Sequence, residues 1–272
     1  MSSTLSKKPW IKNVARVGLI AKGFVYVLLG VLAFMAAFEI GGHSGSKTTK
    51  SGVFDFIKDW PAGNWLLSFL AVGLICYSVW RAIQGFITIK QDETKKKDER
   101  LEKMKGFRYL FSSMTYLFIA FTAIKIVLEG SKKNGDKNQD MAAQLMDMSF
   151  GQWLLGILAL IMFGNGIYQA WYGLSEKYKK HVEKLKYRSG INSLLLHAGK
   201  VGYLSRAAVW FMISYLLMRA AIHAKSSEAG DTGKAFQFIE NSPFGSYLLG
   251  AIGFGLVLYG GFNFIRARYE KF

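Results

Sequence analysis

Charged side chains inside otherwise apolar stretches are the residues of this sequence that could do chemistry. Five cations occupy such stretches: Lys22, Arg81, Lys125, Arg206 and Arg219. A cation held in hydrocarbon is costly unless it reaches an interface, pairs with an acid or faces a polar ligand. These residues therefore indicate snorkelling side chains, a structural ion-pair cluster or a site that attracts anions.

Six long apolar stretches must position these charges. They cover roughly residues 17–39, 62–87, 109–129, 150–174, 201–222 and 244–265. At ~1.5 Å per residue, each can cross the ~30 Å of a hydrocarbon layer as a helix. Hydrophobic residues make up 51% of the 272-residue chain, and its charges are concentrated in the loops. We therefore predict an all-α, polytopic membrane protein with six transmembrane helices rather than a soluble helical bundle.

The net charge of +17 is distributed unevenly between the two ends of these helices. Four segments that fall on one side hold 22 Lys and Arg residues: 1–16, 88–108, 175–200 and 266–272. Three segments on the other side hold 8: 40–61, 130–149 and 223–243. Such a bias is typical of cytoplasmic loops, so both termini are predicted to be cytoplasmic. It also predicts attraction to anionic lipid at the inner face and disfavours a nucleic-acid partner.

The six stretches form three copies of a unit of two helices. Ala15–Phe34 recurs as Lys200–Leu217 at an offset of 184 residues and, more weakly, at an offset of 90. The second helix of each unit begins with a related motif: Pro61-Ala-Gly-Asn-Trp-Leu-Leu-Ser68, Ser149-Phe-Gly-Gln-Trp-Leu-Leu-Gly156 and Pro243-Phe-Gly-Ser-Tyr-Leu-Leu-Gly250. Because each unit has two spans, all three enter the membrane in the same orientation. We predict three tandem two-helix repeats around a pseudo-threefold axis along the membrane normal.

Helix direction separates the five cations, because helical side chains lean toward the helix N-terminus. Lys22 and Arg206 lie near the inner ends of helices that begin inside, so they are expected to snorkel to the inner interface. Arg81, Lys125 and Arg219 lean toward the midplane instead. These three are the candidates for an anion or anionic-lipid site, and a structural ion-pair cluster is the competing explanation.

Titratable residues occupy the predicted outer ends of three helices. Glu39, Glu129 and His223 lie at equivalent positions of the three units, and they form a candidate outer ring that could sense pH. Lys125 and Glu129 also have the spacing of an i,i+4 ion pair. Arg219 is equivalent to Lys125 but has no acid four residues later.

Two kinds of connection join the helices. Within units, Val53–Trp60, Met141–Met148 and Ala235–Asn241 are predicted to form short interfacial helices on the outer side. Between units, Lys90–Lys105 and Ser175–Ser189 carry dense charge, which is typical of solvated inner linkers and is compatible with docking of a protein partner. The predicted units extend over residues 1–90, 91–175 and 176–272.

The repeated signature resembles the bacterial domain of unknown function 1206 (DUF1206) family. It reads basic-x-Gly-x-x-x-basic in the first helix and Pro-Phe-Gly-x-aromatic-Leu-Leu-Gly at the start of the second. The resemblance covers nearly the whole chain and implies three two-helix units in a bacterial inner (plasma) membrane, and it supplies no catalytic residues. The middle unit departs from the pattern, with Ser112 at the second basic position and Ser149 for the proline. This departure argues against equal use of a site by all three units.

Motifs of familiar enzymes are absent from the sequence. It has no GxxxxGKS/T phosphate loop and no HExxH, CxxC or GxSxG motif. The four histidines alternate between the two predicted sides, and Cys76 stands alone inside the second span. We therefore expect no metal, no cofactor and no enzymatic activity of a known type.

The function that these features favour is transport or permeation of a small anionic solute or ion along the pseudo-threefold axis. Arg81, Lys125 and Arg219 would set the electric field along this path. The alternative is a non-catalytic membrane scaffold that binds anionic lipid or a protein partner. A water-filled axis would favour the first function, and a closed, dry axis would favour the second.

Overall fold

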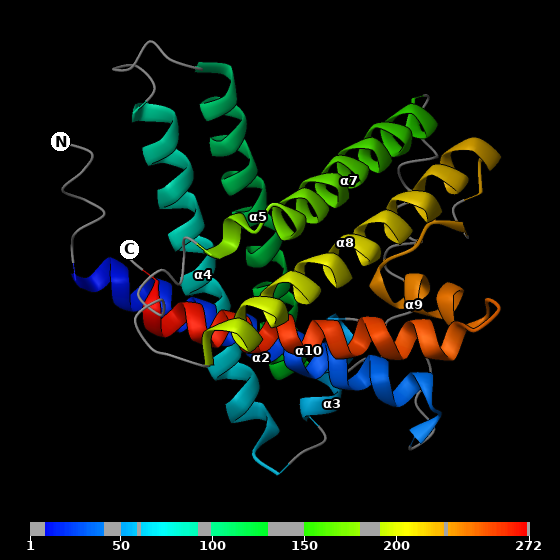
Figure 1. Ribbon diagram of the computed structural model, residues 1–272, viewed down its shortest axis with the longest axis horizontal. Coiled ribbons are helices and arrows are strands. Elements are labelled where there is room, and N and C mark those ends of the chain that lie inside the picture. The colour runs from blue at the N-terminus through cyan, green and yellow to red at the C-terminus, as the bar shows by residue number, and fades with distance from the viewer. Residues whose placement is uncertain are drawn as a thin grey trace.

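The computed structural model describes residues 9–40, 50–58, 61–91, 99–129, 150–179, 191–225 and 228–270. This part of the chain is helical and contains no strand (Figure 1). Six helices are long: α2 (Pro9–Ala37), α4 (Gly63–Gln91), α5 (Glu99–Glu129), α7 (Gly151–Leu174), α8 (Ile191–His223) and α10 (Gly245–Tyr269). Two are short: α3 (Lys50–Lys58) and α9 (Thr232–Glu240).

All six long helices are apolar enough to cross a membrane, with spans of 23 residues in α5 to 28 in α2. At 1.5 Å per residue these spans are ~35–42 Å long, which exceeds the hydrocarbon thickness. The predicted fold class is confirmed, and the chain is a multi-pass membrane protein. α2 begins before the predicted span, at Pro9, because proline is well tolerated in the first helical turn, where its missing N–H has no partner to lose.

Helices of neighbouring units pack against one another. α4 of the first unit lies against α5 of the second, α7 of the second lies against α8 of the third, and α10 of the third returns to α2 of the first. These three pairs are equivalent under the repeat, as a pseudo-threefold arrangement requires. Figure 1 shows α2 and α10 side by side in the lower part of the view, where the last unit meets the first.

Small side chains make these contacts close. A Cβ added at Gly30 would lie 2.5 Å from the carbonyl oxygen of Gly253, and one added at Gly253 would lie 2.8 Å from that of Gly30. The backbones of α2 and α10 therefore touch, as small residues permit between membrane helices. Between α4 and α5, Ser78 Oγ donates to the carbonyl oxygen of Ser113 at 2.8 Å.

The two helices within a unit pack together in the first and third units but not in the second. α2 lies against α4, and α8 lies against α10, whereas α5 and α7 do not form a packed pair over their described residues. Figure 1 shows α5 and α7 spreading apart from each other. The bundle is therefore closed by helix packing on two sides of its axis and not on the third.

A glycine in two units and an arginine in the other explain this difference. A Cβ at Gly18 would lie 2.6 Å from Tyr77 Cα, and a Cβ at Gly202 would lie 2.7 Å from Tyr259 Cα. α2 and α8 can approach α4 and α10 this closely only without a side chain at that point. The equivalent residue of α5, at an offset of 90 from Gly18, is Arg108. Its side chain excludes the same approach to α7.

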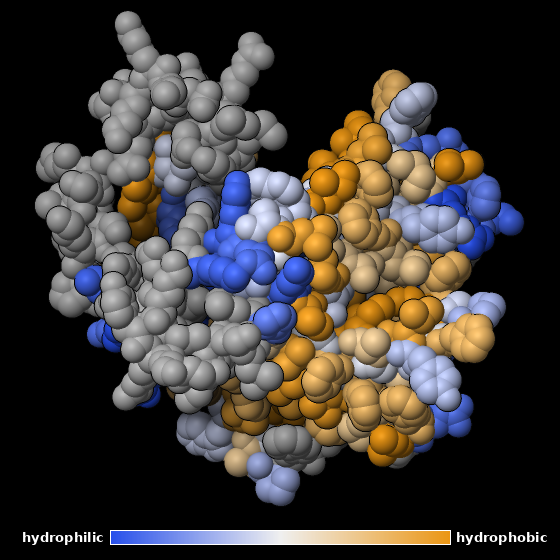
Figure 2. All heavy atoms as spheres, in the orientation of Figure 1, coloured by the Kyte–Doolittle hydropathy of each residue, from blue (hydrophilic) through white to orange (hydrophobic). Residues whose placement is uncertain are grey.

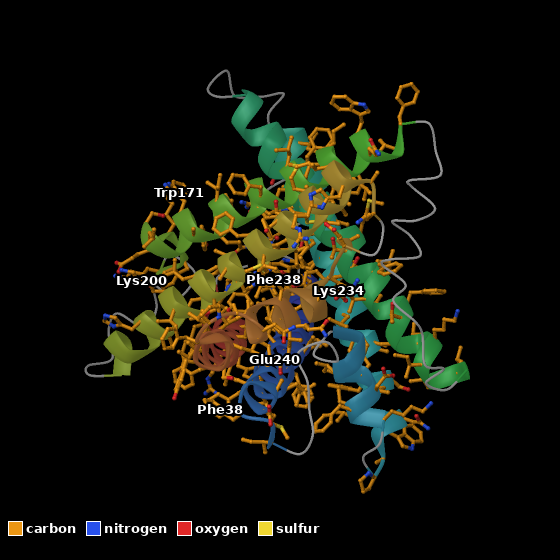
Figure 3. The ribbon with its side chains drawn as sticks, turned by 90° about the vertical axis from the view of Figure 1, so that its right-hand side faces the viewer. Phe38, Trp171, Lys200, Lys234, Phe238 and Glu240 are labelled. Atoms are coloured by element: carbon orange, nitrogen blue, oxygen red, sulfur yellow. The ribbon has the colours of Figure 1, made fainter. Side chains whose placement is uncertain are left out.

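The short helices close the end of the bundle where α2 and α8 finish. α3 packs against α2, α4 and α5, and its Phe54 and Ile57 are fully buried. α9 packs against α8 and α10 through Phe236 and Ile239, and Figure 3 looks onto this helix. Short helices are thus present in the first and third units, whereas Met141–Met148 lies outside the described residues. Their place at the outer interface stays a prediction.

Gly202→Ala is expected to destabilise the protein, because the added Cβ would overlap the backbone of Tyr259. Overpacking of this kind costs about 1–3 kcal/mol, which a melting curve in detergent would detect as a lower Tm. Gly164→Ala in α7 is the matched control, since a Cβ there would meet nothing within 4 Å. Its Tm should stay level or rise slightly through helix propensity. An equal fall in Tm in both variants would contradict the close contact between Gly202 and the backbone of Tyr259.

Candidate functional site

A pocket of about 360 Å³ lies within the bundle. All six long helices contribute to its wall, which contains eight tyrosines, six cationic side chains and one carboxylate. Its volume is within the range of small-molecule binding sites. The described lining residues are Lys22, Tyr26, Tyr77, Arg81, Gln84, Arg108, Tyr109, Phe111, Ser112, Thr115, Tyr116, Asn165, Tyr168, Gln169, Trp171, Tyr172, Lys177, Tyr203, Arg206, Trp210, Tyr259, Arg266 and Glu270.

The repeat brings these residues together. Three sets of equivalent positions line the pocket: Lys22, Ser112 and Arg206; Tyr26, Tyr116 and Trp210; and Tyr77, Asn165 and Tyr259. The first two sets follow from the offsets of 90 and 184, and the third follows from the offsets of 88 and 182 between the second-helix motifs. Equivalent residues of three units meet in one place only where the units surround a common axis. The pocket therefore lies on the pseudo-threefold axis.

In the first unit, a close helix contact places two cations beside one tyrosine hydroxyl. Gly18 lets the backbone of Tyr77 lie against α2. Lys22, one turn after Gly18, donates from Nζ to Tyr77 Oη at 2.9 Å, and Arg81 donates from Nε to the same oxygen at 2.9 Å. Because this oxygen accepts two hydrogen bonds, its own O–H is left to donate to a third group.

The third unit repeats this contact with an arginine. Gly202 lets the backbone of Tyr259 lie against α8, and Arg206 donates from Nη1 to Tyr259 Oη at 2.6 Å. The guanidinium carbon lies 4.6 Å from the ring centroid of Tyr259 and 5.0 Å from that of Tyr26. Desolvated cation–π contacts of this type are worth about 2 kcal/mol. The middle unit has Ser112 in place of the cation.

Lys22 and Arg206 are buried, with 3% and 9% of their surface exposed. The prediction that they snorkel to the inner interface is therefore wrong. Hydrogen bonds to Tyr77 and Tyr259, together with the faces of surrounding tyrosine rings, hold the charges within the bundle. A helical side chain points toward the helix N-terminus, but this direction does not determine where its charge lies. A hydroxyl on a neighbouring helix can hold the charge inside the bundle instead.

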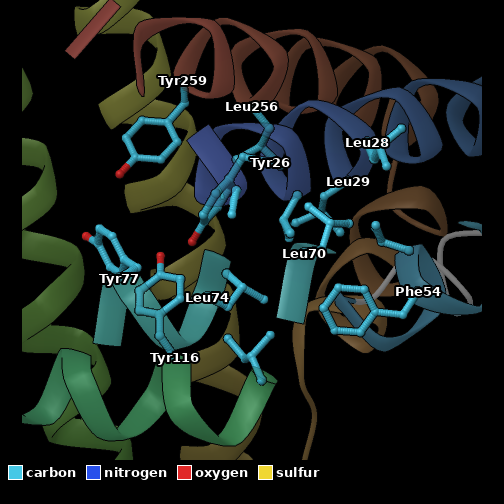
Figure 4. Packing of buried hydrophobic residues seen from close by; sticks show 14 of the residues in the cluster. Tyr26, Leu28, Leu29, Phe54, Leu70, Leu74, Tyr77, Tyr116, Leu256 and Tyr259 are labelled. Atoms are coloured by element: carbon cyan, nitrogen blue, oxygen red, sulfur yellow. The ribbon is translucent and has the colours of Figure 1, made fainter. Parts of the chain in front are cut away.

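The hydroxyl of Tyr116 is buried and has no hydrogen-bond partner among the described residues. The side chain is 6% exposed, and its ring lies edge-on to that of Tyr77 at 4.5 Å between centroids. Figure 4 shows the hydroxyls of Tyr26, Tyr77, Tyr116 and Tyr259 gathered around one space. A buried hydroxyl without a partner costs about 1–3 kcal/mol. An oxyanion bound among these hydroxyls would remove that cost.

Positive charge exceeds negative charge in the pocket. Arg266 and Glu270 form a buried ion pair, with Nη2 2.8 Å from Oε2, and Glu270 is the one acid among the described lining residues. Arg108 lies over the ring of Tyr168, with its guanidinium carbon 3.8 Å from the ring centroid. A cavity lined by charges of one sign, with walls of low dielectric, concentrates counter-ions. Here the counter-ions are anions.

The structure divides the three residues of the predicted anion site. Arg81 lines the pocket, whereas Lys125 and Arg219 do not. These two follow the pocket residues Ser112 and Arg206 by 13 positions. That spacing corresponds to ~20 Å along a helix, so Lys125 and Arg219 lie toward the opposite end of the bundle.

A small ion cluster occupies the end of α8. Arg219 Nε lies 3.3 Å from Glu228 Oε2, and His223 Nδ1 donates to the same oxygen at 2.8 Å. The hydrogen bond from His223, helped by the charge of Arg219, lowers the pKa of Glu228 below its ordinary value. Of the other members of the predicted titratable ring, Glu39 is exposed near the end of α2, and the Glu129 side chain lies outside the described residues.

Sequence reasoning misses several residues that the structure brings forward. The tyrosines of the pocket could be found by aligning the three second helices, which makes Tyr77 and Tyr259 equivalent. Arg108 could be found by aligning the three first helices, in which it stands at the position of Gly18 and Gly202. Glu228 gives no signal beyond its position five residues after His223. In the described part of the chain, no group of three His, Cys, Asp or Glu residues could hold a metal ion.

Comparisons with known proteins agree with the triplicated organisation. The model of the family described as Domain of Unknown Function (DUF1206) matches residues 17–88, 107–176 and 201–270. The chain belongs to this family. Each match covers one pair of long spans. The chain is also 30% identical over 264 residues to "Uncharacterized protein YxxB" of Bacillus subtilis (strain 168), which covers 97% of this chain and 92% of that protein. No solved structure matches the chain.

Tyr77→Phe and Tyr116→Phe are expected to have different effects on the protein without ligand. Tyr77→Phe removes an acceptor of Lys22 and Arg81, so the free energy of unfolding should fall by about 2 kcal/mol. Tyr116→Phe removes a hydroxyl that has no partner, so its Tm should stay level or rise. Thermal unfolding in detergent, followed by tryptophan fluorescence, compares the two variants. A larger loss for Tyr116→Phe would contradict the assigned hydrogen bonds.

Glu228→Gln tests the ion cluster through its pH dependence. A carboxylate whose pKa is lowered by folding stabilises the fold above its ordinary pKa of 4.5, and this contribution is lost as the pH falls through the lowered value. The wild type should therefore melt at a higher temperature than Glu228→Gln at neutral pH. The two Tm values should converge as the pH is brought down to about 3. A difference that stays constant over this range would speak against the cluster.

Proposed function

We propose that the protein transports a small anionic solute, which binds in the axial pocket. The observation that carries this proposal is a pocket within the bundle that is lined by cations, in which tyrosine hydroxyls are left to donate hydrogen bonds. An anion there would accept from Tyr116 and offset the charges of Lys22 and Arg206. Charge-assisted hydrogen bonds are about twice as strong as neutral ones. The proposed role is not enzymatic.

The charge of the loops supports an orientation for this site. Under the positive-inside bias, segments 88–108 and 175–200 are cytoplasmic, as are both termini, in the inner membrane of a bacterium. Arg108 and Lys177, which line the pocket, belong to these segments. We therefore expect the solute to reach the pocket from the cytoplasmic side.

Apolar packing on the other side of the tyrosines bears on the mechanism of transport. Leu29, Phe54, Leu70 and Leu74 are buried, and Figure 4 draws them beside the tyrosines in the direction of α3. A carrier that alternates between two open states has a central site closed to one side at a time. A permanently open channel would instead need a polar path along the whole axis. The packing therefore favours a carrier over a channel.

The same apolar packing favours a second candidate function. This candidate is a membrane scaffold that binds anionic lipid or a protein partner and transports nothing. Such a protein would use the pocket as a permanent binding site and would need no route to the outer side. Both candidate functions require an anion to bind in the pocket. Only the carrier also requires the anion to cross the membrane.

Uptake into proteoliposomes separates these candidates. The probes are radiolabelled inorganic phosphate, sulfate and succinate. Uptake of at least one is expected, with a reduction of about tenfold or more in the triple variant Lys22→Gln, Arg81→Gln, Arg206→Gln, because each change removes a charged donor. The matched control, Lys125→Gln with Arg219→Gln, leaves the pocket intact and should retain uptake.

The Tm of the detergent-solubilised protein, with and without each anion, gives a second readout. If the triple variant does not fold, Arg81→Gln alone takes its place, because that side chain is only partly buried. Equal uptake by the pocket variant and the control would overturn the carrier. Stabilisation by an anion without uptake of any probe would favour the scaffold.

A further inference from the structure

Over the described residues, helix packing does not enclose the pocket on the side of the middle unit. α5 and α7 both line it but do not pack together over their described residues. Phe111 of α5 and Trp171 of α7 belong to the lining and are also exposed, at 38% and 47%. The described residues therefore leave an opening between these two helices, which we call the mouth of the pocket. Because the outer surface of a transmembrane helix faces lipid, this mouth opens toward the bilayer.

An apolar route continues from this mouth along both helices. Phe118 lies two turns after Phe111 on the same face of α5, and it is exposed. On α7, helical spacing puts Ile167 and Gly164 on the face of Trp171. Ile167 is exposed, and a Cβ at Gly164 would meet nothing within 4 Å. The spans of α5 and α7 are also the least buried, at 28% and 17% against 44% or more for the others.

Cations and aromatic rings form the rim of the mouth. The guanidinium carbon of Arg108 lies 3.8 Å from the ring centroid of Tyr168, and Lys177 Nζ lies 3.7 Å from the ring centroid of Trp171. Both cations lie within three residues of the ends of the apolar spans. Figure 2 shows hydrophilic side chains gathered beside the hydrophobic surface of α7 and α8. Such residues gather at the depth of lipid headgroups, and anionic headgroups attract the cations.

We propose that the pocket also admits an anionic phospholipid, whose headgroup binds there and whose acyl chains leave between α5 and α7. This inference rests on the proposed anion binding and adds a second class of ligand for the same pocket. A water-soluble anion needs no apolar exit, whereas a lipid needs a charged pocket joined to the bilayer. Along α5 the lining runs from Arg108 to Tyr116, ~12 Å of helix, so the headgroup is drawn below the interface.

A second buried group without a partner narrows the choice of headgroup. Gln169 Oε1 belongs to the lining and accepts no hydrogen bond from a described residue. A carbonyl oxygen can only accept, so the ligand offers it an O–H or N–H. Phosphatidylglycerol supplies both chemistries, with a phosphate for Tyr116 and the cations and with glycerol hydroxyls for Gln169.

Photocrosslinking in nanodiscs tests this proposal. The probe is phosphatidylglycerol with a diazirine on one acyl chain, in a background of phosphatidylcholine, and the equivalent phosphatidylcholine probe is the headgroup control. Crosslinks are expected on α5 around Phe118 and on α7 around Ile167, about tenfold stronger with the phosphatidylglycerol probe. Lys22→Gln with Arg81→Gln should weaken them by a similar factor, and Arg81→Gln alone replaces this variant if it does not fold.

A pair of glycine substitutions tests the exit separately. Gly164→Trp would fill the route beside α7 without changing the pocket lining, and Gly261→Trp on α10 is its control, because a Cβ at either glycine meets nothing within 4 Å. Crosslinking should be lost in the first variant and retained in the second. Equal crosslinking by the phosphatidylglycerol and phosphatidylcholine probes would overturn the lipid proposal. Crosslinking that is unchanged in the pocket and exit variants would overturn it as well.

Inorganic phosphate shows whether the lipid proposal alone is wrong or whether the pocket binds no anion at all. If the lipid proposal is overturned but phosphate still raises the Tm of the wild type and not that of the pocket variant, the anion site stands and its ligand is water-soluble. If phosphate and lipid both have no effect on the wild type, the pocket binds neither, and both proposals fall.

Discussion

Hydrocarbon offers no partner to a cation, so Lys22 and Arg206 can stay buried only where another helix brings an acceptor to them. Tyr77 and Tyr259 supply that acceptor. They can do so because the glycine one turn before each cation admits the tyrosine backbone. The signature of a glycine followed four residues later by a basic residue is therefore a single packing element. It fixes the spacing of two helices and the charge of the pocket together.

The middle unit has its two helices, α5 and α7, but lacks the glycine followed four residues later by a basic residue. Arg108, Ser112 and Asn165 stand where the other units have a glycine, a cation and a tyrosine. Three changes at one contact remove both the close approach and the hydrogen bond, so α5 and α7 separate. Three identical units would have filled their common axis with three identical contacts. Because the middle unit differs, space remains on the axis for the pocket, and the pocket opens on the side of that unit.

The sequence predicts the features of this protein that depend on local pattern. Length and apolarity define the six spans, and the repeat defines the units and two of the short helices. The environment of Lys22 is different, because it depends on Tyr77, which lies 55 residues away on another helix. The separation of α5 from α7 is an intermediate case. Ser112 marks the middle unit as different, but the steric effect of Arg108 becomes clear only when Gly18 is seen against the neighbouring backbone.

α2 is the most buried of the six spans, and its main neighbour is α10, which lies far later in the chain. Translation proceeds from the N-terminus, so α2 enters the bilayer before α10 exists. Lys22 can meet Tyr77 as soon as α4 is inserted, whereas Arg206 must wait for Tyr259. The nascent chain therefore holds an arginine without its final acceptor, and a glycine face without its partner, until α10 has been synthesised. The packing of α2 is therefore completed only when α10 is inserted.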